Sequence, residues 1–191
     1  MTSCNDRNIS PRKRQLLDGA LRYLLRHGIA NLTLRPLAAA LKTSPRILMF
    51  HFGSKEGLLQ EVLAELHGRV VSSLRALHAE PTTGQGALLE RFWEWATSKK
   101  NLPLLRLLYE TQIVALLNPA EYGRYLKDIS DDWQAAAFET LAPPMQTEAI
   151  ATLCVAVFDG LFLELMATGE HARLTRALKE FIRIANAAPK G

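Results

Sequence analysis

The chain has 191 residues, a formal net charge of +4 and an apolar content of 48%. That length allows one large or two small domains, and that apolar content excludes a disordered chain. Its two cysteines, Cys4 and Cys154, lie far apart without the spacing of a disulfide framework or a metal site, so we expect a reducing, cytoplasmic location and no metal. The N-terminus lacks the apolar core of a signal peptide, and Asp159 and Glu164 interrupt the longest apolar run, which disfavours a transmembrane helix.

The basic residues are concentrated in the first third of the chain. Residues 1–70 hold eleven Lys and Arg against five Asp and Glu, whereas residues 71–191 hold twelve against fourteen. A basic excess in one region suits a polyanionic duplex as partner. By itself it is weak support, because charged surfaces are usually only solvated.

Four helices are predicted in the first part of the chain. Ser10 begins a helix whose leucines recur at helical spacing, and Gly28 ends it as a left-handed cap. Thr33 caps a second helix, which has a proline in its first turn. Ser44, followed by proline, opens the third helix, and Ser54 opens the fourth.

Five more helices are predicted after a break at residues 80–84, and they span residues 85–99, 102–117, 120–141, 147–168 and 170–187. No β alternation is visible, so the expected fold class is all-α with about nine helices. We expect an N-terminal three-helix helix-turn-helix domain over residues 1–65 and a C-terminal helical domain over residues 66–191. The fourth helix belongs to both.

The third predicted helix has one side that suits DNA. At 100° per residue Phe52 shares a side with Leu48, while Arg46 and Phe50 point almost the opposite way. An arginine can bind guanine through two hydrogen bonds, and a phenylalanine can contact a thymine methyl group. Contacts to phosphate would position the helix. The predicted DNA contacts are Thr33, Ser44, Pro45, Arg46, Ile47, Met49, Phe50, His51 and Lys55.

Four of these residues also have a purely structural interpretation. Arg46 fits a solvated charge and Phe50 a core position, but DNA contact is favoured for both. Arginine to guanine is the commonest specific base contact, and the direction of Phe50 opposes that of Leu48. His51 fits packing against a backbone carbonyl as well as it fits phosphate contact. Lys55 opposes the dipole at the start of its helix, a conflict that a nearby phosphate would resolve.

The run Leu37-Ala38, then Ser44, then Leu48 to Leu58 (LMFHFGSKEGL) resembles the DNA-binding domain of the tetracycline-repressor (TetR) family. The resemblance covers roughly residues 10 to 60. It implies a homodimeric transcriptional regulator, most often a repressor, on a palindromic double-stranded DNA operator. It also implies that a small molecule entering the C-terminal domain releases the operator, and that the last two helices pair with those of a second subunit.

Two positions depart from the family pattern. Lys42 stands where the family usually has glycine, so either Lys42 adopts a left-handed conformation at some cost or the turn differs. Met49 stands where the family usually has a tyrosine whose phenol donates to phosphate. Since Met49 has no such donor, operator affinity or preference is expected to differ.

Large side chains on the later helices are candidates for an effector site, although each is also compatible with an ordinary core. The predicted ligand contacts are Trp93, Leu107, Glu110, Trp133, Phe158 and Phe162. Polar candidates within the apolar runs are Glu110, Gln112, Asp159 and Glu164. The last two helices carry apolar faces for either internal packing or dimerisation: Leu153, Val157, Leu161 and Leu165 on one, and Leu174, Leu178, Phe181, Ile182 and Ala185 on the other.

The expected function is that of a dimeric, sequence-specific DNA-binding regulator released from its operator by a largely apolar small molecule. The alternative is a dimeric helical small-molecule-binding protein with weakened or lost DNA recognition. An enzyme is not expected, because the chain has no phosphate-binding glycine loop, HExxH metal motif or nucleophile elbow. We expect no cofactor and no membrane association.

Overall fold

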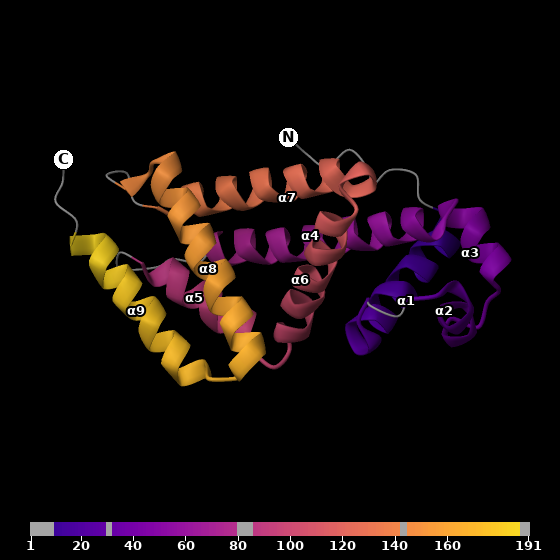
Figure 1. Cartoon of the computed structure of the whole chain (residues 1–191), viewed down its shortest axis with the longest axis horizontal. Helices are drawn as coiled ribbons and strands as arrows, with labels where there is room; N and C mark the ends of the chain where they lie inside the picture. Colours follow the sequence, from indigo (N-terminus) through magenta and orange to yellow (C-terminus); the bar gives the residue numbers. More distant parts are fainter. Residues whose placement is uncertain (1–9, 30–31, 80–85, 142–144, 188–191) are drawn as a thin grey trace. The chain divides into compact units, whose positions relative to one another are not determined.

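A computed structural model describes residues 10–29, 32–79, 86–141 and 145–187, and all regular structure in them is helical (Figure 1). The predicted all-α class is confirmed. Three features of the sequence analysis lie outside the described residues: Cys4, the break at residues 80–84, and the prolines at 143 and 144. The helices are α1 (Pro11–His27), α2 (Leu34–Ala40), α3 (Pro45–Phe52), α4 (Lys55–Ala79), α5 (Ala87–Thr97), α6 (Leu102–Leu117), α7 (Pro119–Thr140), α8 (Glu148–Thr168) and α9 (His171–Ala187).

Most helix ends follow the predicted signals. The hydroxyl oxygens of Ser10, Ser44 and Ser54 accept hydrogen bonds from backbone N–H groups three residues later, at 3.2, 3.3 and 2.8 Å. Thr33 occupies the N-cap position of α2, but its side chain makes no capping hydrogen bond. Gly28 has the positive φ expected of it, 70°, with an extended ψ of −179° instead of a left-handed helical one.

The chain forms two compact units. Unit 1 comprises residues 1–68 and 107–123, and unit 2 comprises residues 69–106 and 124–191. Unit 1 therefore contains α1 to α3 and the start of α4, together with most of α6 and the first turn of α7. The assignment of DNA binding to residues 1–65 and of ligand binding and dimerisation to residues 66–191 stays a prediction.

Unit 1 is built around a leucine-rich core. Its buried side chains come from α1, α2, α3, the first half of α4 and the parts of α6 and α7 in this unit, among them Leu16, Leu21, Leu24, Leu37, Leu48, Leu58, Leu63, Leu107 and Leu108. Two ion pairs tie α1 to α4 at the edge of this core: Lys13 Nζ lies 2.7 Å from Glu61 Oε1, and Arg14 Nη1 lies 2.8 Å from Glu65 Oε2. These two ion pairs connect α1 to α4.

Unit 2 is built around aromatic rings from α5, α7 and α8. Phe92 lies at its centre, with its ring centroid 5.2 Å from that of Phe158 and 6.1 Å from that of Trp133. The Trp93 ring stacks on Phe162 at 5.2 Å, and Trp93 Nε1 donates a 2.9 Å hydrogen bond to Thr175 Oγ1 of α9. Phe92, Trp93, Phe158 and Phe162 are buried, and a role of these rings in effector binding stays a prediction.

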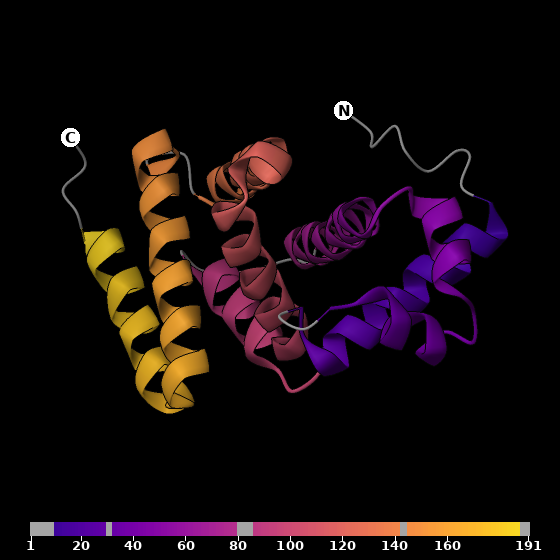
Figure 2. The same ribbon diagram turned by 45° about the vertical axis from the view of Figure 1, so that its right-hand side comes forward.

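The helices α8 and α9 run side by side in unit 2 (Figure 2). The aliphatic side chains Leu174, Leu178 and Ile182 of α9 are buried within the chain, as is Leu165 of α8. The predicted face of α9 thus packs mostly within the chain, whereas on the predicted face of α8 only Leu165 is buried. The large apolar side chains left exposed on these two helices are Leu153, Leu163 and Ile184.

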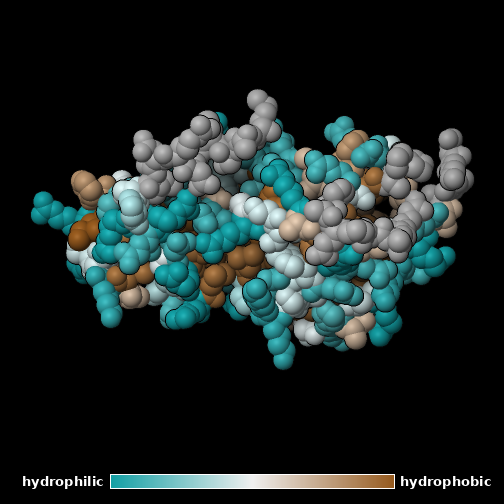
Figure 3. Space-filling view, turned by 180° about the vertical axis from the view of Figure 1, so that it is seen from behind, coloured by the Kyte–Doolittle hydropathy of each residue, from teal (hydrophilic) through white to brown (hydrophobic). Residues whose placement is uncertain are grey.

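The face shown in Figure 3 is mainly hydrophilic, with smaller hydrophobic patches between hydrophilic side chains. Among the described helices α8 alone is long and apolar enough to cross a membrane, with a mean hydropathy of 2.0. That property is weak evidence of a span, since core helices of soluble proteins share it. Cys154 of α8 is buried beside Leu141 and Ala151, and burial raises the pKa of its thiol. Cys154 is thus a small residue of the core of unit 2.

Candidate nucleic-acid interface

The turn between α2 and α3 is a Schellman motif centred on Lys42. The N–H of Thr43 donates to the carbonyl of Ala38 at 2.9 Å, and the N–H of Lys42 donates to that of Ala39 at 3.1 Å. Lys42 has φ 51° and is the one non-glycine residue with positive φ in the described ranges. Of the two alternatives for this position, the left-handed lysine is the one observed, and the usual turn geometry is retained without glycine.

The third helix has the two sides that its sequence predicts. Leu48 and Phe52 are buried, with 1% and 6% of their surfaces exposed. Phe50 on the opposite side is 84% exposed, and Arg46 beside it is exposed as well. The flanking residues Ile47 and Met49 are exposed by 40% and 39%. The interpretation of Phe50 as a core residue is therefore wrong.

Three features hold α3 in place. Ser44 caps its first turn, and Gly53, with φ 75°, ends it by donating its N–H to the carbonyl of Met49 at 2.8 Å. On the inner side, Lys13 Nζ lies 5.3 Å from the centroid of the Phe52 ring, a cation–π arrangement. The same ammonium group pairs with Glu61 of α4, so one lysine connects α1, α3 and α4.

The remaining predicted DNA contacts surround this helix. Thr33 and Lys55, at the starts of α2 and α4, are exposed, whereas Ser44 and Pro45 are half-buried. His51 is half-buried, and its ring centroid lies 5.2 Å from that of Phe50 and 6.4 Å from that of Phe52. This arrangement gives His51 a packing role. Contact of each of these residues with DNA stays a prediction.

Residues 16–62 match the sequence model of the "Bacterial regulatory proteins, tetR family". The chain is 27% identical over 172 residues to the HTH-type nicotine-responsive transcriptional repressor HdnoR of Paenarthrobacter nicotinovorans, a match that covers 85% of this chain and 87% of HdnoR. The fold matches a TetR-family regulator structure from Rhodococcus sp. (TM-score 0.73, 16% identity, 93% and 99% of the two chains). It also matches the multidrug binding protein EbrR complexed with ethidium (TM-score 0.68, 22% identity, 88% and 97%).

The family model and the curated relative together support a TetR-family regulator. The matched segment contains the whole of α2 and α3, so the family signal and the exposed side of α3 coincide. The chain is accordingly a DNA-binding regulator, and proteins of the TetR family are generally not enzymes. In the described part of the chain no group of three His, Cys, Asp or Glu is placed to hold a metal ion.

The structure brings some of the predicted effector-binding residues together and places others in a different unit. Trp93, Phe158 and Phe162 meet in the aromatic core of unit 2, where Phe158 and Phe162 lie 5.9 Å apart. Trp133 joins them through Phe92. The other two predicted residues, Leu107 and Glu110, belong to unit 1.

Glu110 has a structural partner in unit 1. Its Oε2 atom accepts a 3.2 Å hydrogen bond from the N–H of Ile29, just beyond the end of α1. A Cβ atom on Gly28 would lie only 2.9 Å from the same oxygen. The carboxylate therefore fits closely against the backbone that follows α1. Binding of an effector by Glu110 or Leu107 stays a prediction.

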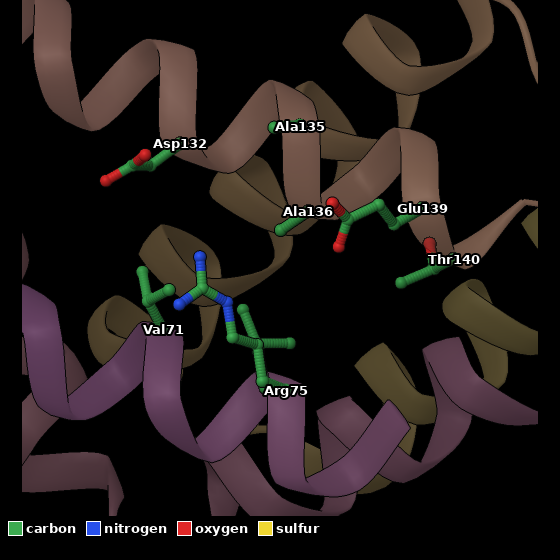
Figure 4. Close-up of a pocket in the computed structure, with 8 residues that line it drawn as sticks. Val71, Arg75, Asp132, Ala135, Ala136, Glu139 and Thr140 are labelled. Carbon is green, nitrogen blue, oxygen red and sulfur yellow. The ribbon is translucent and has the colours of Figure 1, made fainter. Parts of the chain in front are cut away.

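Unit 2 has a small pocket between the second half of α4 and α7 that the sequence analysis missed (Figure 4). Its volume is about 50 Å³, and none of the predicted ligand contacts lines it. The Arg75 side chain extends from α4 toward α7, and Glu139 reaches from α7 into the same space (Figure 4). Its lining is completed by Val71, Leu74, Asp132, Ala135, Ala136 and Thr140. In the sequence, the feature of α7 that corresponds to this pocket is the placement of Ala135 and Ala136 between Asp132 and Glu139.

Proposed function

We propose that the chain is a homodimeric transcriptional repressor that binds a palindromic operator and leaves it when a small organic molecule binds. The observation that carries the proposal is the outward side of α3. Arg46 and the 84% exposed Phe50 project from a helix whose inner side is fixed in the core by Leu48 and Phe52. A large apolar side chain so exposed on a rigid helix favours an intermolecular contact. Next to an arginine, within a helix-turn-helix, a DNA groove is the fitting partner.

Dimerisation is supported by the apolar residues that α8 exposes in the single chain. One side of α8 carries four exposed small or apolar residues at the three- and four-residue spacing along which two helices pair. This seam consists of Leu153, Ala156, Gly160 and Leu163. A Cβ atom on Gly160 would meet no atom within 4 Å, so a second helix can approach there closely. A dimer supplies two α3 helices, one for each half-site of a palindrome, and such half-sites lie about 34 Å apart.

Effector release is supported by the relatives. HdnoR is named for its response to nicotine, and EbrR is a multidrug binding protein seen with ethidium. For this chain we propose a small, largely apolar organic effector that binds unit 2. Such a molecule releases DNA only if it binds more tightly to the conformation in which the two α3 helices no longer match the half-sites.

The proposal is tested by titrating the purified chain onto labelled duplexes from the DNA that flanks its own gene, with fluorescence anisotropy as the readout. We expect a saturable complex whose affinity falls steeply with added salt, because phosphate contacts release counterions. Arg46→Ala should weaken binding roughly 5- to 150-fold and relax the base preference, the loss of about 1–3 kcal/mol for one bidentate contact.

Arg124→Ala is the matched control, because this arginine of α7 is 95% exposed and lies in unit 2. It should bind DNA like the unmodified chain. Equal affinities for the Arg46 variant and the unmodified chain on every duplex would refute the assignment of α3 to the groove.

A further inference from the structure

The outward side of α3 carries four side chains, and three of them are apolar. Phe50 is 84% exposed, and Ile47 and Met49 are exposed by 40% and 39%. Arg46 is the one of the four that can donate a hydrogen bond to a base. The helix therefore offers a single guanidinium group surrounded by hydrocarbon and a thioether.

The polar residues beside this surface offer few groups to base edges. Ser44 Oγ accepts the N–H of Ile47 as the cap of α3. Thr43 is half-buried, and its hydroxyl oxygen is buried without a hydrogen-bond partner. The half-buried His51 ring contacts the rings of Phe50 and Phe52. Within α3, Arg46 and His51 are therefore the two side chains that can hydrogen-bond to a base.

The major groove presents one apolar group that distinguishes a base, which is the C5 methyl of thymine. Every other distinguishing group in that groove is a hydrogen-bond donor or acceptor. Placing Phe50, Met49 or Ile47 against such polar edges would desolvate them without replacing their hydrogen bonds. Placing the same side chains against methyl groups removes apolar surface from water on both sides.

We propose that this chain selects its operator chiefly by thymine methyl groups, which Phe50, Met49 and Ile47 contact around one base pair bound by Arg46. Phe50 is the main specificity-determining residue, because it is the most exposed of the three apolar side chains. The inference rests on the proposed function, since it assumes that α3 enters the major groove. It adds the chemistry by which the operator is recognised.

The test begins with selection of duplexes from a random library by the full-length chain, followed by measurement of affinity for the selected duplex. Each thymine is then replaced singly by deoxyuridine, which removes the methyl group and keeps the base pairing. For the unmodified chain we expect at least one thymine in each half-site whose replacement weakens binding about fourfold, the value of one buried carbon group.

The variant that identifies the reading side chain is Phe50→Ala. It should bind the selected duplex more weakly, and replacement of the critical thymine by deoxyuridine should then change its affinity by less than twofold. Leu117→Ala is the control, because Leu117 of α6 is 75% exposed and lies outside α3. It should keep the full sensitivity to deoxyuridine.

Three results would overturn the inference. The selected duplex could contain no thymine whose replacement matters, or the fourfold loss could persist in Phe50→Ala, Met49→Ala and Ile47→Ala alike. Either result leaves DNA binding and the proposed function intact. Failure to enrich any duplex would overturn the proposed function and the inference together.

Discussion

Lys42 occupies the left-handed position of the α2–α3 turn, where a side chain is unfavourable. Both hydrogen bonds of the Schellman motif form around it, so the turn keeps its geometry in spite of the Cβ atom. An L-residue in this conformation loses roughly 1–2 kcal/mol relative to an unstrained one, and glycine avoids that loss. Lysine at this position therefore lowers the stability of unit 1 relative to glycine, unless a favourable interaction of its charge offsets the strain.

We predict that Lys42→Gly stabilises the protein by about 1 kcal/mol, because it removes the strain at φ 51°. Urea denaturation followed by circular dichroism measures the change. Lys42→Ala is the matched control: it removes the same charge but keeps Cβ, so it should bring no comparable gain. If both variants gain equally, repulsion between charges accounts for the effect and backbone strain does not.

At the level of elements, the contact between α6 and the end of α1 connects distant parts of the sequence within unit 1. Ile29 is buried with 6% of its surface exposed, and its N–H depends on the Glu110 carboxylate at 3.2 Å. A buried N–H left without an acceptor costs roughly 1–3 kcal/mol. This hydrogen bond gives the Glu110 carboxylate, which lies in the apolar sequence of α6, a structural role that requires no effector.

We predict that Glu110→Ala destabilises the chain by about 1–2 kcal/mol, because the N–H of Ile29 loses its acceptor. Glu110→Gln should lose less than half as much, since its amide oxygen can still accept. Thermal unfolding measures both, with Gln112→Ala as the control on the same helix. Unchanged stability of Glu110→Ala together with a lost effector response would instead restore the ligand-binding role expected from the sequence.

For the whole molecule, the exposed seam of α8 leads to a prediction about assembly. We expect the chain to sediment at twice its 21.3 kDa mass at micromolar concentration. Leu163→Glu should produce monomers, because it places a charge in an apolar contact between two copies of α8. The same substitution at Leu116, which is 65% exposed on α6, should leave the dimer intact. Sedimentation of the unmodified chain as a monomer would exclude this seam as the interface.

The sequence was informative where a property depends on neighbours along the helix. The 100° spacing placed Leu48 inside and Phe50 outside, and the serine caps marked three helix starts, because these features arise within one or two turns. It was less informative where distant segments meet. Nothing local to Glu110 signals that α6 contacts the end of α1, or that Arg75 and Glu139 share a pocket. Such contacts depend on how whole helices pack.

The aromatic core of unit 2 also determines what can be seen spectroscopically. All three tryptophans of the chain, Trp93, Trp95 and Trp133, belong to unit 2, and unit 1 contains none. Intrinsic indole emission therefore monitors the proposed effector-binding part of the molecule without any label. Events at α3 have no indole beside them in unit 1, so a dye on the duplex would follow those separately.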